Sequence, residues 1–128
     1  MKTETRVAPP NSIVFLTDGA LPTDGSIEVP EVTREDKIVW ATPTCVVVGT
    51  LCEVDGESHL VLSDESPSDK ATILAYESIV ETPSKELALS NAQNELLVKI
   101  PVPNLHSRVN IWVNDTSEPD EIYVLIVS

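Results

Sequence analysis

The fold is decided by Ser107-Arg-Val-Asn-Ile-Trp-Val-Asn114 and, after an acidic turn, Glu121-Ile-Tyr-Val-Leu-Ile-Val-Ser128. Hydrophobic and polar residues alternate in the first stretch, and the second repeats a period of two, which is typical of β-strands. The connection, Asp115-Thr-Ser-Glu-Pro-Asp120, consists largely of turn-forming residues. The sequence therefore predicts an antiparallel hairpin.

The register of this hairpin follows from its aliphatic residues. Aligning the two groups that suit a core places Trp112 across from Tyr123 and Asn110 across from Leu125. The other face then combines aromatic anchors with a polar rim, as partner-binding patches do. The predicted partner-binding residues are Arg108, Asn110, Trp112, Tyr123 and Leu125, with Asp115, Glu118, Asp120 and Glu121 around them. The alternative is that the N-terminal segment or Lys85 to Asn94 covers these side chains.

Strand-like stretches fill most of the remaining chain. They are Ser12–Leu16, Lys37–Ala41, Thr44–Val54, Ser58–Leu62, Lys70–Glu81 and Leu96–Val102, separated by segments rich in Gly, Pro, Asp and Asn. Thr17–Gly25 reads as a turn-rich connection, and Pro30 places Ser26–Val32 at a sheet edge or in an extended loop. Asp55-Gly56 predicts a tight hairpin between Thr44–Val54 and Ser58–Leu62. Residues 1–10 read as a loosely ordered entry segment.

One stretch, Pro83–Glu95, fits two structures. Ser84 is a suitable cap for a short helix over Lys85 to Ala92. A strand from Lys85 to Ser90, followed by a polar loop, is favoured because Leu87 and Leu89 share one parity and no helical stripe continues.

The strand count and composition together predict the fold class. The chain has 128 residues, a common size for one domain, and its 17 valines and 9 isoleucines suit sheets better than helices. About eight or nine strands at short, regular spacing favour an all-β antiparallel β-sandwich with at most one short helix, over residues 1–128. Units of alternating strand and helix would require long crossovers that the sequence lacks.

The charge restricts the classes of partner. With 21 acidic residues against 8 Lys and Arg, the net charge is −13. Such a field repels phosphate backbones and anionic membranes, so we expect neither nucleic-acid nor membrane binding. Solubility alone is the simpler explanation of the same charge. The N-terminal residues lack the apolar core of a secretory signal, and no apolar run is long enough to span a membrane, which favours a cytoplasmic protein.

Residues with catalytic or metal-binding chemistry are sparse. Cys45 and Cys52 are expected to be free, buried thiols on opposite faces of one strand, although a bulge at Gly49 would bring them to the same face. His59 and His106 stand alone, so no zinc motif is present. Pairs of acids in loops, Asp55 with Glu57, Asp64 with Asp69 and Asp115 with Asp120, lack the spacing of a calcium loop. We expect no enzyme activity, catalytic residue, bound metal or cofactor.

The second half of the chain resembles a known group of small bacterial β-sandwich proteins. Its stretches Glu77–Leu89, Glu95–Pro101, Val109–Val113 and Glu121–Val127 follow the strand order and lengths of the competence-associated DNA-entry nuclease inhibitor and similar immunity-type proteins. The resemblance covers residues 70 to 128. It implies an acidic cytosolic protein that binds a toxic or nucleolytic partner, and it assigns no individual functional residue.

Three hypotheses for function follow. In the first, the chain is a non-enzymatic inhibitor or immunity-like module whose acidic surface binds a basic protein, such as a nuclease or toxin. In the second, it is a structural β-sandwich that forms a homodimer through the terminal hairpin. In the third, its loops bind a small ligand or calcium.

Overall fold

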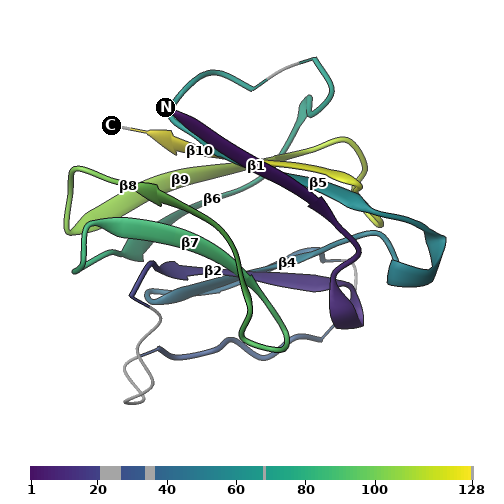
Figure 1. Ribbon diagram of the computed structural model, residues 1–128, viewed down its shortest axis with the longest axis horizontal. Coiled ribbons are helices and arrows are strands. Elements are labelled where there is room, and N and C mark those ends of the chain that lie inside the picture. The colour runs from purple at the N-terminus through teal and green to yellow at the C-terminus, as the bar shows by residue number, and fades with distance from the viewer. Residues whose placement is uncertain (21–26, 34–36, 68, 128) are drawn as a thin grey trace.

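The structure is a computed structural model and describes residues 1–20, 27–33, 37–67 and 69–127. Two five-stranded sheets pack face to face (Figure 1). In sheet A the order is β1 (Lys2–Val7), β5 (Ser58–Ser63), β10 (Glu121–Val127), β9 (His106–Val113) and β6 (Ile73–Glu81). In sheet B it is β3 (Val39–Thr42), β4 (Cys45–Gly49), β2 (Ile13–Asp18), β7 (Glu86–Asn91) and β8 (Leu96–Pro101).

The core between the sheets is aliphatic. Alternate residues of each strand point inward, so that Val109, Ile111 and Val113 of β9 are fully buried and face the second sheet. Leu16 of β2 and Leu89 of β7 contribute from sheet B. The abundance of valine and isoleucine in the sequence therefore supplies both inner faces, and the predicted all-β sandwich is confirmed.

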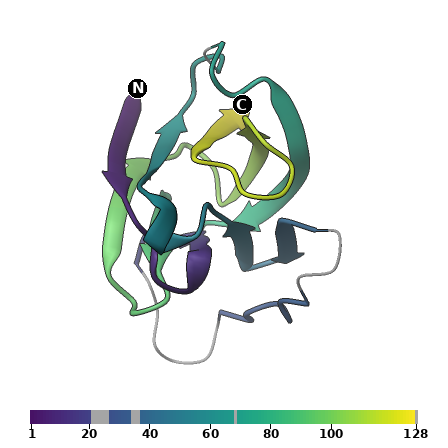
Figure 2. The same ribbon diagram turned by 90° about the vertical axis from the view of Figure 1, so that its right-hand side faces the viewer.

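The two sides of the sandwich differ. On one side β1, at the edge of sheet A, lies against β8, at the edge of sheet B (Figure 2). On the other side the edge strands are β6 and β3. A groove separates the inner side of β6 from β3 and from residues 28–31, so this second side is more open.

Several local predictions were wrong because they assumed pairing between neighbours in sequence. Thr44–Val54 is not one strand, since β4 ends at Gly49 and a short 3-10 helix, Glu53–Asp55, follows. This connection carries the chain from sheet B to sheet A, so β4 and β5 do not form a hairpin. The sandwich is not purely antiparallel either, because β10 pairs with β5 in parallel.

The N-terminal segment is also more ordered than expected. Residues 2–7 form β1, which pairs with β5 along its whole length, and a 3-10 turn, Pro10–Ser12, leads into β2. Its alternating polar pattern suits an edge strand with one solvent-facing side. The described residues form ten strands, where eight or nine were expected, and this segment is one of them.

Two ambiguous stretches are resolved. Residues 86–91 form strand β7, as the parity of Leu87 and Leu89 predicted, and no α-helix occurs in the described ranges. Residues 27–33 belong to no sheet and pack Ile27 and Val32 against Trp40 on the outer face of sheet B. The predicted turn-rich connection Thr17–Gly25 ends within residues 21–26, which lie outside the described residues. Ser26, the first residue of the predicted segment Ser26–Val32, also lies outside them.

Within the residues described, no helix has the length and apolar character needed to cross a bilayer.

Candidate functional site

The terminal hairpin forms with the predicted register. Trp112 lies opposite Tyr123, and Asn110 lies opposite Leu125. All four belong to the outer face of sheet A, because the residues between them are in the core. The alternation in the sequence therefore identified the correct face.

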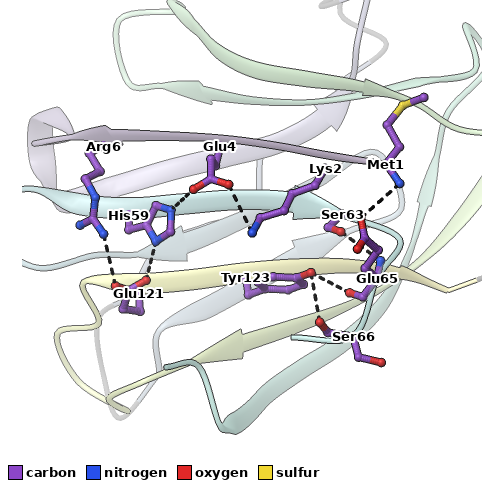
Figure 3. Close-up of polar contacts among 10 residues, drawn as sticks. All are labelled: Met1, Lys2, Glu4, Arg6, His59, Ser63, Glu65, Ser66, Glu121 and Tyr123. Atoms are coloured by element: carbon purple, nitrogen blue, oxygen red, sulfur yellow. Dashed lines mark hydrogen bonds and ion pairs between the residues drawn. The ribbon is translucent and has the colours of Figure 1, made fainter. Parts of the chain in front are cut away.

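The exposure predicted for this face is wrong for Tyr123. Its side chain is only 5% exposed and packs with Val61 and Ala71. Its hydroxyl donates hydrogen bonds to the carbonyl oxygens of Glu65 at 2.7 Å and Ser66 at 3.3 Å (Figure 3). The connection between β5 and β6 thus covers the ring, whereas the predicted alternatives for a cover were the N-terminal segment and Lys85 to Asn94.

The neighbouring residues are covered in part. Trp112 and Leu125 are half-buried and pack against the cluster formed by Val61, Ala71 and Tyr123. The aromatic pair is consequently a small second core beneath the β5–β6 connection, and it leaves little of the indole for a partner.

The acidic loop of the hairpin is organised by its own hydrogen bonds. Oδ1 of Asp115 accepts bonds from the amides of Glu118 and Ser117 at 3.0 and 2.8 Å, which hold the pKa of Asp115 below its usual range. Asp120 accepts a bond from the side-chain amide of Asn114. Glu118 is exposed. Two of the predicted rim acids therefore shape the loop.

Glu121 takes part in a row of charges across β1, β5 and β10 (Figure 3). Its Oε2 lies 2.7 Å from Nδ1 of His59, and Nε2 of the same ring lies 2.9 Å from Oε1 of Glu4. Both contacts are hydrogen bonds only when both ring nitrogens carry protons. Arg6 adds a longer contact to Glu121, at 3.8 Å. This row ties three strands together and engages Glu121 within the fold.

We expect this row of charges to stabilise the protein less in acid than at neutral pH. The hydrogen bond from His59, followed by that from Lys2, lowers the pKa of Glu4 below its ordinary value. A lowered folded-state pKa stabilises the protein above the unfolded-state value, and this contribution disappears as the pH falls through the folded-state value. We expect the difference in unfolding free energy between the wild type and Glu4→Gln to shrink between about pH 5 and pH 3. Urea denaturation across this range measures it, and a difference that grows in acid would contradict it.

Two predicted residues, Arg108 and Asn110, do meet on an open part of the outer face. They line a shallow hollow of 530 Å³ together with Val127 of β10 and with Glu77 and Ile79 of β6. Leu125 lies beside Asn110 in the ladder. The hollow adjoins the covered aromatic cluster and leads to the edge of sheet A.

That edge carries the main concentration of exposed hydrophobic side chains. Of the nine large hydrophobic residues exposed in the described ranges, four are on β6, namely Ile73, Leu74, Tyr76 and Ile79. We call these four side chains the β6 surface. Isolated exposed hydrophobic residues are common, but here four gather on one edge strand, with Ile73 and Tyr76 toward its inner side and Leu74 and Ile79 toward its outer face. Such a concentration of exposed hydrophobic side chains is of the kind that binds other proteins.

A groove of 700 Å³ continues this patch on the open side of the sandwich. Its walls are residues 28–31, residues 37–42 and residues 73–76, and Thr116 of the hairpin loop also lines it. Tyr76 faces the groove because it pairs with Ile111, whose side chain points inward. The backbone of Glu28 bonds Thr44 and Thr42, which fixes residues 28–31 beside β3.

The charge around the β6 surface is mainly negative. Glu77 and Glu81 are exposed on β6, Glu28 and Glu31 are exposed in the groove wall, and the nearby bases among the described residues are Lys37 and Arg108. None of the four glutamates forms an ion pair with another described residue. Their carboxylates are therefore exposed without a countercharge from the described part of the chain.

Sequence reasoning predicted a strand over Lys70–Glu81 but missed its position at the edge of the sheet and its exposed side chains. Apolar residues occur on both parities of residues 73–80, a pattern that buried central strands also show. Glu77 and Glu81 were the available signal, because charges in an otherwise apolar strand are typical of sheet edges. The pattern indicated a strand and gave no position in the sheet.

The cysteines and acids offer little chemistry. Both thiols are free, as predicted, although Cys52 is half-buried rather than buried. Burial raises the pKa of Cys45 to about 12, so its reactive thiolate is scarce at neutral pH. Across the described part of the chain, no group of three His, Cys, Asp or Glu side chains is arranged to hold a metal ion.

Comparison with known proteins gives one clear structural likeness. No family model and no curated protein sequence matches the chain. A protein described as "Crocagin biosynthetic gene J" matches with a TM-score of 0.45 and 11% identity, over 97% of this chain and 94% of its own. ComJ of Bacillus subtilis, an inhibitor of the DNA degrading activity of NucA, has a TM-score of 0.69 and 10% identity, over 98% of this chain and 95% of its own. The resemblance expected for residues 70–128 is thus confirmed in structure, and the likeness of fold to ComJ extends over nearly the whole chain.

Proposed function

We propose that this protein is a non-enzymatic inhibitor that binds a basic protein partner, a nuclease in the first instance, through the β6 surface. The observation that carries the proposal is the gathering of Ile73, Leu74, Tyr76 and Ile79 on one edge strand of a chain with a net charge of −13. Hydrophobic anchors supply the desolvated contact, and the surrounding glutamates select a positively charged partner.

A nuclease fits this surface for a physical reason. Proteins that bind DNA neutralise its phosphates with Lys and Arg, and an acidic protein competes for the same positive site. Exposed acids such as Glu77 and Glu81 would also accelerate the encounter at low salt. The fold similarity to ComJ, itself an inhibitor of a DNA-degrading activity, supports the same function.

The structure favours this surface over the hairpin alone. Tyr123 is buried and Glu121 is paired with His59, so the hairpin contributes Arg108 and Asn110 at the margin of the site, with Leu125 beside Asn110 in the ladder. Because Tyr123 and Glu121 are engaged within the fold, less of the hairpin surface is left for self-association. We propose that this protein is cytoplasmic, that its partner is a protein, and that it binds neither nucleic acid nor membranes.

The test combines capture of the partner protein with an assay of its DNA-degrading activity. The immobilised protein is exposed to a lysate of its source at low salt, and the recovered protein is assayed for DNA degradation with increasing amounts of the soluble chain. We expect a basic protein whose DNA cleavage falls to near zero at an equimolar amount of the chain, and whose association slows as salt is raised. Recovery of no basic protein, or of one whose cleavage is unchanged by the chain, would contradict the proposal.

A further inference from the structure

The backbone of β6 has an unpaired side. In sheet A, β6 is an edge strand with β9 as its one strand neighbour (Figure 2, in teal). Among the described residues, the one other backbone hydrogen bond of β6 runs from the amide of Glu81 to the carbonyl of Pro43, at 2.9 Å. The turn between β3 and β4 therefore caps only the C-terminal end of the strand.

This bond also shows which groups of β6 point away from β9. In an antiparallel ladder, successive residues direct their N–H and C=O groups to opposite sides of the strand. Because the amide of Glu81 points outward to Pro43, those of Ile79 and Glu77 point outward too. Ser78 and Val80 instead direct theirs to β9. Two residues in the middle of β6 thus present donors and acceptors to a further strand.

Hollows lie on both sides of these groups. Along the edge and toward the inner side, a hollow of 450 Å³ lies between residues 41–43 and the side chains of Tyr76 and Ser78, is also lined by Ile79, Glu81 and His106, and adjoins the larger groove. On the outer side is the hollow formed with Arg108 and Asn110. A strand added to β6 would point its side chains alternately into these two spaces, which is how strand addition gains specificity.

Charge decides between two occupants of this edge. In a symmetric pairing of two copies centred on Ile79, Glu77 of one copy would lie opposite Glu81 of the other. A pairing centred on Glu77 would set the two Glu77 carboxylates opposite each other. Like charges directly opposite are destabilising, and each copy carries −13 overall. The irregularity between Leu74 and Tyr76 further limits pairing between copies.

We propose that the edge of β6 receives an extended, basic segment of the partner protein as an added strand, hydrogen-bonded to the backbone of Glu77 and Ile79. This inference rests on the proposed function and specifies how the partner is bound. Lysine or arginine side chains of the added strand meet Glu77 and Glu81, and its apolar side chains enter the hollows.

Proline substitution distinguishes backbone pairing from side-chain contact. Ile79→Pro removes an outward N–H that no strand of this sheet uses, so the fold tolerates it. Ile79→Ala removes a similar amount of side chain and keeps the N–H. We expect Ile79→Pro to weaken binding of the captured partner at least about tenfold more than Ile79→Ala does. Ser78→Pro is the structural control, because it removes a bond to β9 and should lower the melting temperature.

Amide hydrogen exchange gives a second test that does not require the natural partner. The probe is acetyl-Lys-Val-Lys-Val-Lys-Val-amide, and its control is the same peptide with methylated backbone nitrogens. At a peptide concentration about nine times the dissociation constant, exchange at Glu77 and Ile79 should slow about tenfold. The methylated peptide should leave it unchanged.

The outcomes separate this inference from the proposed function. If the partner is captured and inhibited but Ile79→Pro and Ile79→Ala bind equally well, the added strand is refuted and the inhibitor stands. If capture fails while the peptide protects Glu77 and Ile79, the proposed function fails and strand addition is supported. Absence of protection by the peptide, or a dimer of the chain that Ile79→Pro dissociates, overturns the assignment of a basic partner strand.

Discussion

Ile111→Ala is expected to lower the free energy of unfolding by about 2–5 kcal/mol. Ile111 is fully buried at the middle of β9 and packs in the core between the sheets. Its truncation removes buried methyl groups and leaves a cavity that strands held on both sides cannot fill. Since small domains have total stabilities of about 5–15 kcal/mol, this single change removes a large fraction. Urea denaturation should show a lower midpoint at an unchanged slope.

Ile79→Ala provides the matched control for this prediction. The same residue type occurs on the neighbouring strand, but Ile79 is 53% exposed and points to the outer face. We expect its truncation to change stability by no more than about 0.5 kcal/mol. Equal losses for the two variants would show that β6 is buried in solution, and the β6 surface would then not be available to a partner.

Ile79→Arg is expected to weaken partner binding by about 2 kcal/mol or more, which is roughly thirtyfold. The substitution replaces a central hydrophobic anchor and adds a positive charge opposite a basic partner. Arg108 is paired with Ile79 across the ladder, so the new side chain also lies beside a like charge. Titration calorimetry with the captured partner measures the change, and circular dichroism checks that the fold is retained.

The control is Leu96→Arg. Leu96 is 49% exposed on β8, the edge strand of the other sheet, and is therefore an equivalent aliphatic residue outside the proposed site. This variant has the same change in charge and should bind the partner with wild-type affinity. If both variants lose affinity equally, general charge attraction explains the binding, and the β6 surface has no special role.

The sequence predicted local pairing well where one face of a strand is apolar. In the terminal hairpin, shifting the register by one residue would expose Val109 and Ile111, so the alternation fixes both the pairing and the buried face. The parity of Leu87 and Leu89 identified β7 in the same way. Both results depend on residues close in sequence.

Interactions between distant segments escaped this reasoning. Nothing in the alternation of residues 44–62 indicates that the chain changes sheets after Gly49, because a strand suits either layer. Tyr123 was placed on the correct face, but its burial depends on a connection 57 and 58 residues away in sequence. The edge position of β6 likewise depends on which strands of the whole chain are neighbours.

The parallel pairing of β10 with β5 has a consequence for biosynthesis. β10 is the last strand of the sandwich in chain order, yet it occupies the centre of sheet A, between β5 and β9. The pair of β1 and β5 can therefore join the pair of β9 and β6 only after this final strand has emerged from the ribosome exit tunnel. Closure of that layer is thus a late event that joins segments far apart in sequence, which is slow compared with hairpin formation.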